Sequence, residues 1–382
     1  MKVEKLTTKQ LSIPYIDESK SDWTDQLGVQ LYIKCDTDKV TGWGETLVGG
    51  GVVNSYRSVI ENLIMKLISG ETVQDVNVVT EKLEKSLFTA GLCGIANSAI
   101  SGVDMALWDA HAKENAKPIS DMIGGAKRGR IPVHATLPRY SSIDQLLIAV
   151  RNSINRGFTL IKLHQPPGMT IDSVREIRKK FGKEVGLAID LNALYDVARG
   201  REFLRNIRRY EPEWVEEPLW PPNDYDSLGL LTKNTDVPIA VGENEYSVYG
   251  FKRIIEAGTS VIQPDISRVG GLRHFLEIIE LAKSFKVNIA PHLGIHRSAI
   301  SFAVTLQVAA ARPEITTVEH CLATYPSDIF TGLGKAVNGE VDLPRGDGLG
   351  IQINENGFKG YKYHDRFRLL EFSDLQKPRG AA

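Results

Sequence analysis

The sequence predicts an α/β protein built around a (β/α)8 barrel of the TIM type, with an N-terminal α+β capping domain that the C-terminal segment completes. Three observations predict this fold. Eight short apolar runs recur between residues 131 and 320. Segments with the 3.6-residue periodicity of amphipathic helices separate these runs. Polar residues stand at the carboxyl ends of the runs, where barrel enzymes carry their active sites.

The first third of the chain, residues 1–127, predicts the capping domain. The runs LGVQLYIKC and VTGWGETLV flank a turn-like DTDK and predict two strands, and amphipathic stretches follow from about residue 53 to 117. Trp108 lies among apolar residues at helical spacing, so we expect it in a core or an interface. Strands followed by helices indicate a small α+β domain.

Residues 128–330 predict the barrel. Its eight expected strands are IPVHATL, TLIKLH, VGLAIDLN, EWVEEP, VPIAVGEN, SVIQPD, VNIAPH and ITTVEH. Helical segments such as IDSVREIRKKFG lie between them, and eight successive units of this kind indicate a closed barrel rather than an open sheet. From about Thr331 the pattern lapses into segments rich in Gly and Pro, and we expect residues 331–382 to pack back on the capping domain.

Composition and charge argue against several classes of protein. The 46 Lys and Arg residues balance 47 Asp and Glu residues without blocks of like charge, which argues against nucleic-acid and membrane partners. There is no signal-peptide core and no run of 18 apolar residues. The three cysteines, Cys35, Cys93 and Cys321, are too few and too scattered for a disulfide framework. We therefore expect a cytoplasmic protein that acts on a small molecule.

Carboxylates end three consecutive predicted strands, at Asp190, Glu216 and Glu243. Acids that converge from neighbouring strands repel one another in a partly desolvated site, and a bound cation relieves this repulsion. Ligands that are all oxygen atoms favour a hard ion, Mg²⁺ first and Mn²⁺ second. We therefore predict that these three residues bind a metal ion. The alternative is a set of ordinary surface carboxylates.

Nitrogen bases flank the predicted metal from two sides of the barrel mouth. Lys162 and His164 end the second strand on the same face, while His292 ends the seventh strand across the ring. Asp265, on the sixth strand, is placed to hold the His292 imidazole in one tautomer. The arrangement suits abstraction of a proton beside a carboxylate, with Lys162 and the metal stabilising the enediolate. For His164, a hydrogen bond to substrate or packing beside the next loop is the alternative.

The strand-end residues occur together with the motifs GWGE, SGVDMALWD, VEEP, GEN and QPDISRVGG. This combination resembles the enolase superfamily and, within it, the mandelate racemase subgroup, over nearly the whole chain. The resemblance implies abstraction of the proton α to a carboxylate, followed by loss of a β-hydroxyl or by reprotonation. It also implies a homo-oligomer.

The family pattern can be carried over residue by residue. It places the metal ligands, the His–Asp dyad and the eighth-strand glutamate at Asp190, Glu216, Glu243, His292, Asp265 and Glu319. Asn192 matches an asparagine that contacts substrate oxygen in many members. On the second strand, racemase-type members carry Lys-x-Lys, with the second lysine as the base. Here Lys162 matches the first lysine, but His164 occupies the position of the base.

Other candidate residues have two interpretations each. Glu319 either hydrogen-bonds the enediolate or pairs with a nearby buried cation. Arg268, on the loop after the sixth strand, either binds the substrate carboxylate or pairs with an acid such as Glu217. Trp23 lies in residues 13–26, a segment expected to cover the barrel mouth, where it either lines the substrate pocket or packs against the barrel rim.

The resemblance therefore implies a Mg²⁺-dependent lyase, a hydro-lyase that dehydrates a sugar acid, because this is the commoner activity among such relatives. A racemase or epimerase of a 2-hydroxy acid is the second hypothesis, although a Lys-x-His pair suits a symmetrical two-base reaction less well. A non-catalytic ligand-binding relative is a third hypothesis, and the complete set of site residues speaks against it. A zinc hydrolase would need His-x-His on the first strand, where His134 has no such partner.

Overall fold

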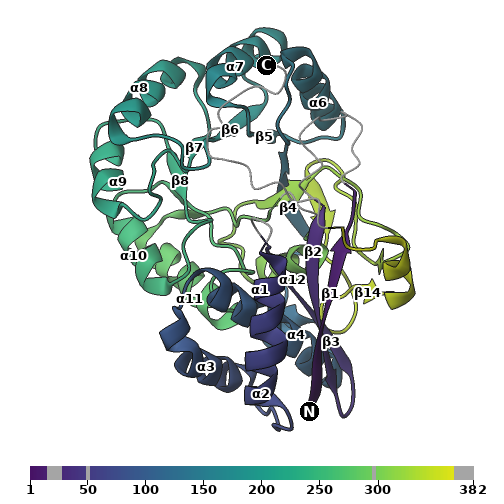
Figure 1. Ribbon diagram of the computed structural model, residues 1–382. Helices are drawn as coiled ribbons and strands as arrows, with labels where there is room; N and C mark the ends of the chain where they lie inside the picture. The colour runs from purple at the N-terminus through teal and green to yellow at the C-terminus, as the bar shows by residue number, and fades with distance from the viewer. Residues whose placement is uncertain (15–27, 49–51, 295–297, 365–382) are drawn as a thin grey trace.

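The structure is a computed structural model that describes residues 1–14, 28–48, 52–294 and 298–364 (Figure 1). Trp23 and most of the predicted cover at residues 13–26 lie outside the described residues. Among the described helices, none is both long and apolar enough to cross a membrane. The fold class agrees with the prediction, a capping domain beside a barrel.

The capping domain contains an antiparallel sheet of three strands, β1 (Val3–Ser12), β2 (Val29–Thr37) and β3 (Thr41–Thr46), in that order. Strands β2 and β3 confirm the two predicted ones. Strand β1 was not predicted, because most of its residues are polar and no apolar alternation marks it; its pairing with β2 defines it. The helical segments that follow are α1 (Val53–Ser58), a π-helix (Val59–Ile64), α2 (Met65–Ile68), α3 (Val76–Leu87), a 3-10 turn (Phe88–Ala90), α4 (Gly94–Glu114) and α5 (Ile119–Met122).

Two glycines of the GWGE motif allow helix α4 to lie directly against strand β3. A Cβ atom at Gly44 would stand 1.9 Å from the carbonyl oxygen of Gly102, and one at Gly42 would stand 2.0 Å from that of Ala106. Both positions would therefore clash with helix backbone, which has no rotamer to change. Trp43, between them, is buried and packs edge-on against Phe358, with 5.7 Å between the ring centroids.

The barrel contains all eight predicted strands, and each is parallel to its neighbours in the order β10-β9-β8-β7-β6-β5-β4-β11. The strands are β4 (Arg130–Thr136), β5 (Leu160–Leu163), β6 (Gly186–Asp190), β7 (Trp214–Glu216), β8 (Ile239–Val241), β9 (Val261–Ile262), β10 (Asn288–Ile289) and β11 (Val318–Cys321). Between β10 and β11 the ring closes through a parallel bridge of Ile289 with Ile315, where the Thr316 N–H donates to the Ile289 carbonyl over 3.0 Å.

Seven helices alternate with the strands, as predicted: α6 (Ile143–Asn155), α7 (Pro167–Phe181), α8 (Val197–Ile207), α9 (Tyr225–Thr232), α10 (Val248–Glu256), α11 (Leu272–Phe285) and α12 (Ala299–Ala311). A 3-10 turn (Arg208–Tyr210) follows α8. Every residue of α12 is buried, because this helix contacts strand β3 of the capping domain as well as the barrel. After β11 the described chain continues without an eighth helix, through β12 (Phe330–Thr331), β13 (Glu340–Asp342), β14 (Gln352–Ile353) and a 3-10 helix (Glu355–Gly360).

The C-terminal segment contacts both parts of the molecule. Strand β13 pairs antiparallel with the start of β4, and Asp342 lies opposite Arg130. The Phe358 ring stacks on Tyr32 of the capping sheet at 5.9 Å between centroids. The Leu349 N–H donates to Asp109 of α4 over 2.9 Å. The segment therefore joins the barrel floor to the capping sheet.

Two buried acids of the capping domain hold the first turns of barrel helices. Glu45 Oε2 accepts the N–H groups of Ile300 (3.0 Å) and Ser301 (3.1 Å) in α12, and Asp104 Oδ1 accepts the Leu272 N–H (2.7 Å) of α11. Helix N-termini carry unpaired N–H groups that carboxyl oxygens satisfy. Burial raises the pKa of Glu45 to about 8 and that of Asp104 to about 7. These contacts attach the capping domain to the barrel on the side of α11 and α12.

The close contact of β3 with α4 leads to a stability prediction. Replacing Gly44 with Ala should lower the free energy of unfolding by about 1–3 kcal/mol, because the added methyl group forces the helix away from the strand. Urea denaturation followed by circular dichroism measures the change. Gly129→Ala is the matched control, since a Cβ atom there meets nothing within 4 Å. A Gly44→Ala protein as stable as the Gly129→Ala protein would contradict the packing argument.

Candidate active site

An apolar layer inside the barrel supports the site. Side chains of alternate strand residues face the interior, and the partly buried Leu160 packs there against a buried cluster of Ala188, Trp214, Ala240, Val261 and Ala290. Two residues further along four of these strands, on the same face, stand Lys162, Asp190, Glu216 and His292. The polar groups therefore lie above an apolar floor, at the carboxyl ends of the strands.

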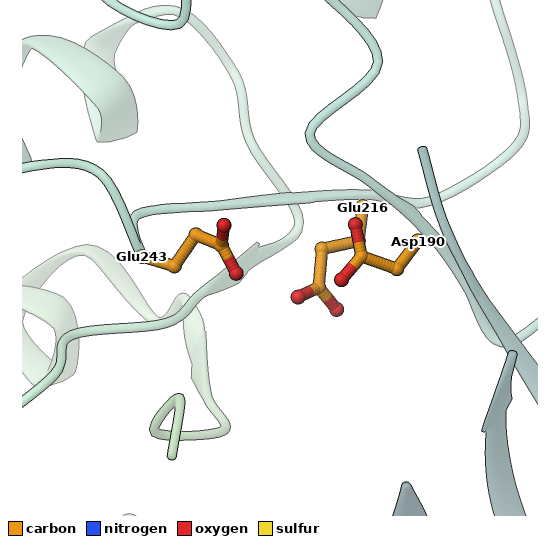
Figure 2. Close-up of side chains that lie close together, drawn as sticks. All are labelled: Asp190, Glu216 and Glu243. Carbon is orange, nitrogen blue, oxygen red and sulfur yellow. The ribbon is translucent and has the colours of Figure 1, made fainter. Parts of the chain in front are cut away.

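Asp190, Glu216 and Glu243 come together as predicted from their positions at strand ends. Asp190 and Glu216 lie opposite each other in the β6–β7 ladder, and Glu243 follows β8. One carboxylate oxygen of each lies within 4.8 Å of the others, and all three residues are buried (Figure 2). Burial and the charge of Asp190 raise the pKa of Glu216 well above its usual range. A buried set of three oxygen ligands fits a hard divalent cation, which would relieve this repulsion.

The Lys162 ammonium group is fully buried beside these acids. Its Nζ atom lies 2.7 Å from Glu216 Oε1, 2.9 Å from Glu319 Oε1 and 3.5 Å from Asp190 Oδ2. Burial alone would lower the pKa of Lys162, but the surrounding carboxylates raise it well above its usual range. Lys162 is therefore charged and adds positive charge next to the candidate metal ligands.

Glu319 is held as the partner of this buried cation. Its Oε1 also accepts the Thr136 hydroxyl over 2.7 Å, and its Oε2 accepts the Leu293 N–H over 2.9 Å. Burial would raise the pKa of Glu319, but the charges of Lys162 and His292 outweigh it and lower the pKa to about 2. These contacts correspond to the second of the two interpretations of Glu319, an ionised carboxylate that pairs with a buried cation.

His164 is anchored through one ring nitrogen and presents the other to the acid cluster. Its Nδ1 lies 2.8 Å from the Leu137 carbonyl oxygen, which can only accept, so Nδ1 carries a proton. Its Nε2 lies 2.9 Å from Asp190 Oδ2. The hydrogen bond to the Leu137 carbonyl thereby holds the proton on Nδ1 and leaves Nε2 facing Asp190.

His292, which follows another strand, is also held by a hydrogen bond at Nδ1. Its Nδ1 lies 2.7 Å from Asp265 Oδ2 and its Nε2 lies 3.1 Å from Glu243 Oε2. Asp265 is held in turn by the N–H (2.7 Å) and hydroxyl (2.6 Å) of Ser267. Burial disfavours the charged imidazole, but Glu243, Glu319 and Asp265 outweigh it and raise the pKa of His292 to about 9. The two imidazoles thus present Nε2 atoms to different members of the carboxylate cluster.

Asn192 and Arg268, which were predicted to contact substrate, form hydrogen bonds within the protein. Asn192 Nδ2 donates to Asp190 Oδ1 over 3.0 Å, and Asn192 Oδ1 accepts from Arg139 Nη2 over 2.8 Å. Arg268 Nη1 donates to Asn244 Oδ1 over 2.7 Å. The expected alternative partner of Arg268, Glu217, instead accepts the Gly242 N–H over 3.2 Å.

Two polar residues of the site were not predicted from the sequence. Arg139, three residues beyond β4, donates from Nε to the His164 carbonyl over 2.9 Å and so links His164 to Asn192. Its position just after the first strand was the available signal. Gln263, two residues beyond Val261, is buried, and its amide has no hydrogen-bond partner within the described residues. The motif QPD, which contains Gln263 and Asp265, was the available signal.

Two family models match successive parts of the chain. Residues 145–357, more than half of the chain, match the family model described as "Enolase C-terminal domain-like". Residues 19–124 match the model of the mandelate racemase/muconate lactonizing enzyme N-terminal domain.

Curated relatives align along most of the chain. A D-galactonate dehydratase of Ralstonia nicotianae is 29% identical in an alignment 347 residues long, which covers 85% of this chain and 89% of the relative. A D-galactonate dehydratase of Xanthomonas campestris is 28% identical in an alignment 354 residues long, which covers 86% of this chain and 90% of the relative.

Solved structures share the fold. The 3,6-anhydro-D-galactonate cycloisomerase from Zobellia galactanivorans has a TM-score of 0.83 at 26% identity, over 94% of this chain and 99% of that one. A member of the enolase superfamily from Polaromonas sp. JS666 has a TM-score of 0.85 at 30% identity, over 96% and 98% of the two chains. The chain therefore belongs to the enolase superfamily, in its mandelate racemase/muconate lactonizing enzyme group.

Proposed function

We propose that this protein is a Mg²⁺-dependent hydro-lyase that removes water from a sugar acid after abstracting the proton α to its carboxylate. The protein is an enzyme, a lyase or an isomerase. Relatives named D-galactonate dehydratase, at 26–29% identity over about 85% of this chain, support the choice of sugar acids as substrates. They make D-galactonate the first compound to test.

The observation that carries the proposal is the pair of anchored imidazoles beside the carboxylate cluster. His164 Nε2 lies against Asp190 and His292 Nε2 lies against Glu243, so two groups that can accept or donate a proton face one site. Dehydration needs both functions, because a base takes the C2 proton and an acid protonates the departing C3 hydroxyl. A non-catalytic binding protein would need neither function.

We assign His164 as the base and His292 as the acid. The Leu137 carbonyl holds the proton of His164 on Nδ1, which leaves Nε2 to take the C2 proton. Asp265 stabilises the charged form of His292, from which Nε2 can donate to the leaving hydroxyl. Lys162 contributes positive charge where the enediolate develops. A divalent ion held by Asp190, Glu216 and Glu243 would supply further positive charge for the same enediolate.

An isomerase is the second candidate, and the same geometry favours it. Two bases on different sides of a carbanionic centre can remove a proton from one face and return one to the other. A neighbouring structure is that of a cycloisomerase acting on 3,6-anhydro-D-galactonate. Analysis of the product separates the candidates, since dehydration forms a 2-keto-3-deoxy acid and epimerisation preserves the hydroxyl groups.

The metal site leads to a prediction about activity. Glu216→Gln should lower kcat/KM by at least about a hundredfold. The variant loses one charged metal ligand and also one of the negative charges that pair with Lys162. Chelation with EDTA should abolish the activity of the unmodified enzyme, and Mg²⁺ should restore it. Measurement is by formation of the 2-keto product from D-galactonate and a panel of other sugar acids.

Glu213→Gln is the matched control for Glu216→Gln. Glu213 is an exposed carboxylate just before the same strand, β7, away from the cluster. We expect this variant to keep its activity within about twofold, as surface substitutions usually do. Full activity of the enzyme after removal of all divalent metal would contradict the proposed cofactor.

The two imidazoles should be separable by isotope exchange. His292→Asn should still exchange the C2 proton of the substrate with D₂O but lose dehydration by about a hundredfold or more, because it keeps the base and lacks the acid. His164→Asn should lose both exchange and dehydration. Proton NMR of the recovered substrate, with product analysis in parallel, measures the two steps. Exchange retained in His164→Asn and lost in His292→Asn would reverse the assignment.

A further inference from the structure

A cavity of about 600 Å³ lies on the outer side of strand β11. The other barrel strands are each followed by a helix, whereas the described chain after β11 forms no helix before the short strand β12. The cavity lies between helix α6 and this segment, residues 322–337, where an eighth helix would otherwise pack. Because side chains alternate along a strand, Glu319 faces the active site while the next residue, His320, faces this cavity.

The charged groups on the cavity wall are all basic. Arg156 and Lys335 line it, and no carboxylate occurs among the described residues of its lining. The Arg156 side chain touches the Leu322 carbonyl at 3.5 Å and the Phe158 ring at 5.5 Å, and neither group neutralises its charge. Lys335 likewise has no carboxylate beside it among the described residues of the lining. The wall therefore carries two positive charges, and its described lining supplies no counterion for them.

A buried imidazole adds a polar atom without a partner. His320 is 4% exposed, and its Nδ1 makes no hydrogen bond within the described residues. Phe158 and Phe302 pack against its ring, with centroids 5.8 and 5.3 Å away, so the ring cannot turn easily. An unpaired buried nitrogen is unfavourable, and a ligand that hydrogen-bonds it removes that cost.

The rest of the wall is largely apolar. Leu322, Phe330, Leu333 and Ala336 contribute to the lining. Cavities of this size bind small organic molecules, in which a few polar groups set the orientation and apolar surface supplies affinity. The cavity thus combines an apolar body with an anion-binding edge.

We propose that this cavity is a second ligand site, separate from the active site, for a small organic carboxylate whose body is a ring or short alkyl chain. Arg156 and Lys335 bind the carboxylate, and His320 donates or accepts one hydrogen bond. The apolar residues cover the ring or chain. A sugar acid lacks the apolar body, so the substrate proposed above is a poor ligand here.

Two fluorescent probes that differ mainly in charge test the proposal. 8-Anilinonaphthalene-1-sulfonate carries an anion on an apolar body, and N-phenyl-1-naphthylamine is its neutral counterpart. Arg156→Gln should weaken binding of the anionic probe by about tenfold and change that of the neutral probe by less than about twofold. Lys335→Gln, at an exposed position, should show the same selectivity and covers the case in which Arg156→Gln does not fold.

Arg151→Gln is the matched control, because Arg151 lies on helix α6, which ends just before Arg156, and its guanidinium lies over the Phe181 ring instead. It should bind both probes like the unmodified protein. Octanoate or phenylacetate should displace the anionic probe, while D-galactonate with Mg²⁺ should not. Equal loss of both probes in Arg156→Gln and Lys335→Gln, unchanged binding of the anionic probe in both, or its displacement by D-galactonate would overturn the proposal.

Discussion

The buried ammonium of Lys162 determines how the candidate active site is assembled. It lies within 3.5 Å of carboxylates from three strands, Asp190, Glu216 and Glu319, in an interior closed below by apolar side chains. Without positive charge nearby, the free-energy cost of burying these carboxylates together would be too large for a stable fold. One cation is available from the chain itself, and a divalent ion would supply the rest. The resulting field favours negative charge on a bound substrate, which is what an enediolate intermediate requires.

The two imidazoles of the site are both held by a hydrogen bond at Nδ1. In His164 the anchor is a backbone carbonyl, and in His292 it is the Asp265 carboxylate. Both anchors hold Nδ1 and leave Nε2 toward the carboxylate cluster, but they differ in charge. A carbonyl fixes orientation only, whereas a carboxylate also stabilises the imidazolium. This difference is the physical basis for assigning His164 as base and His292 as acid.

The capping domain is joined to the barrel by buried polar contacts as well as by apolar packing. Glu45 and Asp104 meet the first turns of α12 and α11, the helices that follow the strands of His292 and Asp265. Close contact of β3 with α4, which Gly42 and Gly44 permit, brings both acids to this interface. The orientation of the capping domain is thereby coupled to the part of the barrel that carries the dyad.

The sequence by itself determined the eight barrel strands and the seven helices, because each is marked by a local pattern of apolar residues. It also determined the convergence of Asp190, Glu216 and Glu243, because each of them stands at the end of a predicted strand. The polar strand β1 escaped prediction, since its pairing with β2 defines it. Only the tertiary structure decided that Glu319 pairs with Lys162, that Arg139 bridges His164 and Asn192, and that a basic cavity lies outside β11. These depend on distances between segments far apart in the chain, which no local pattern contains.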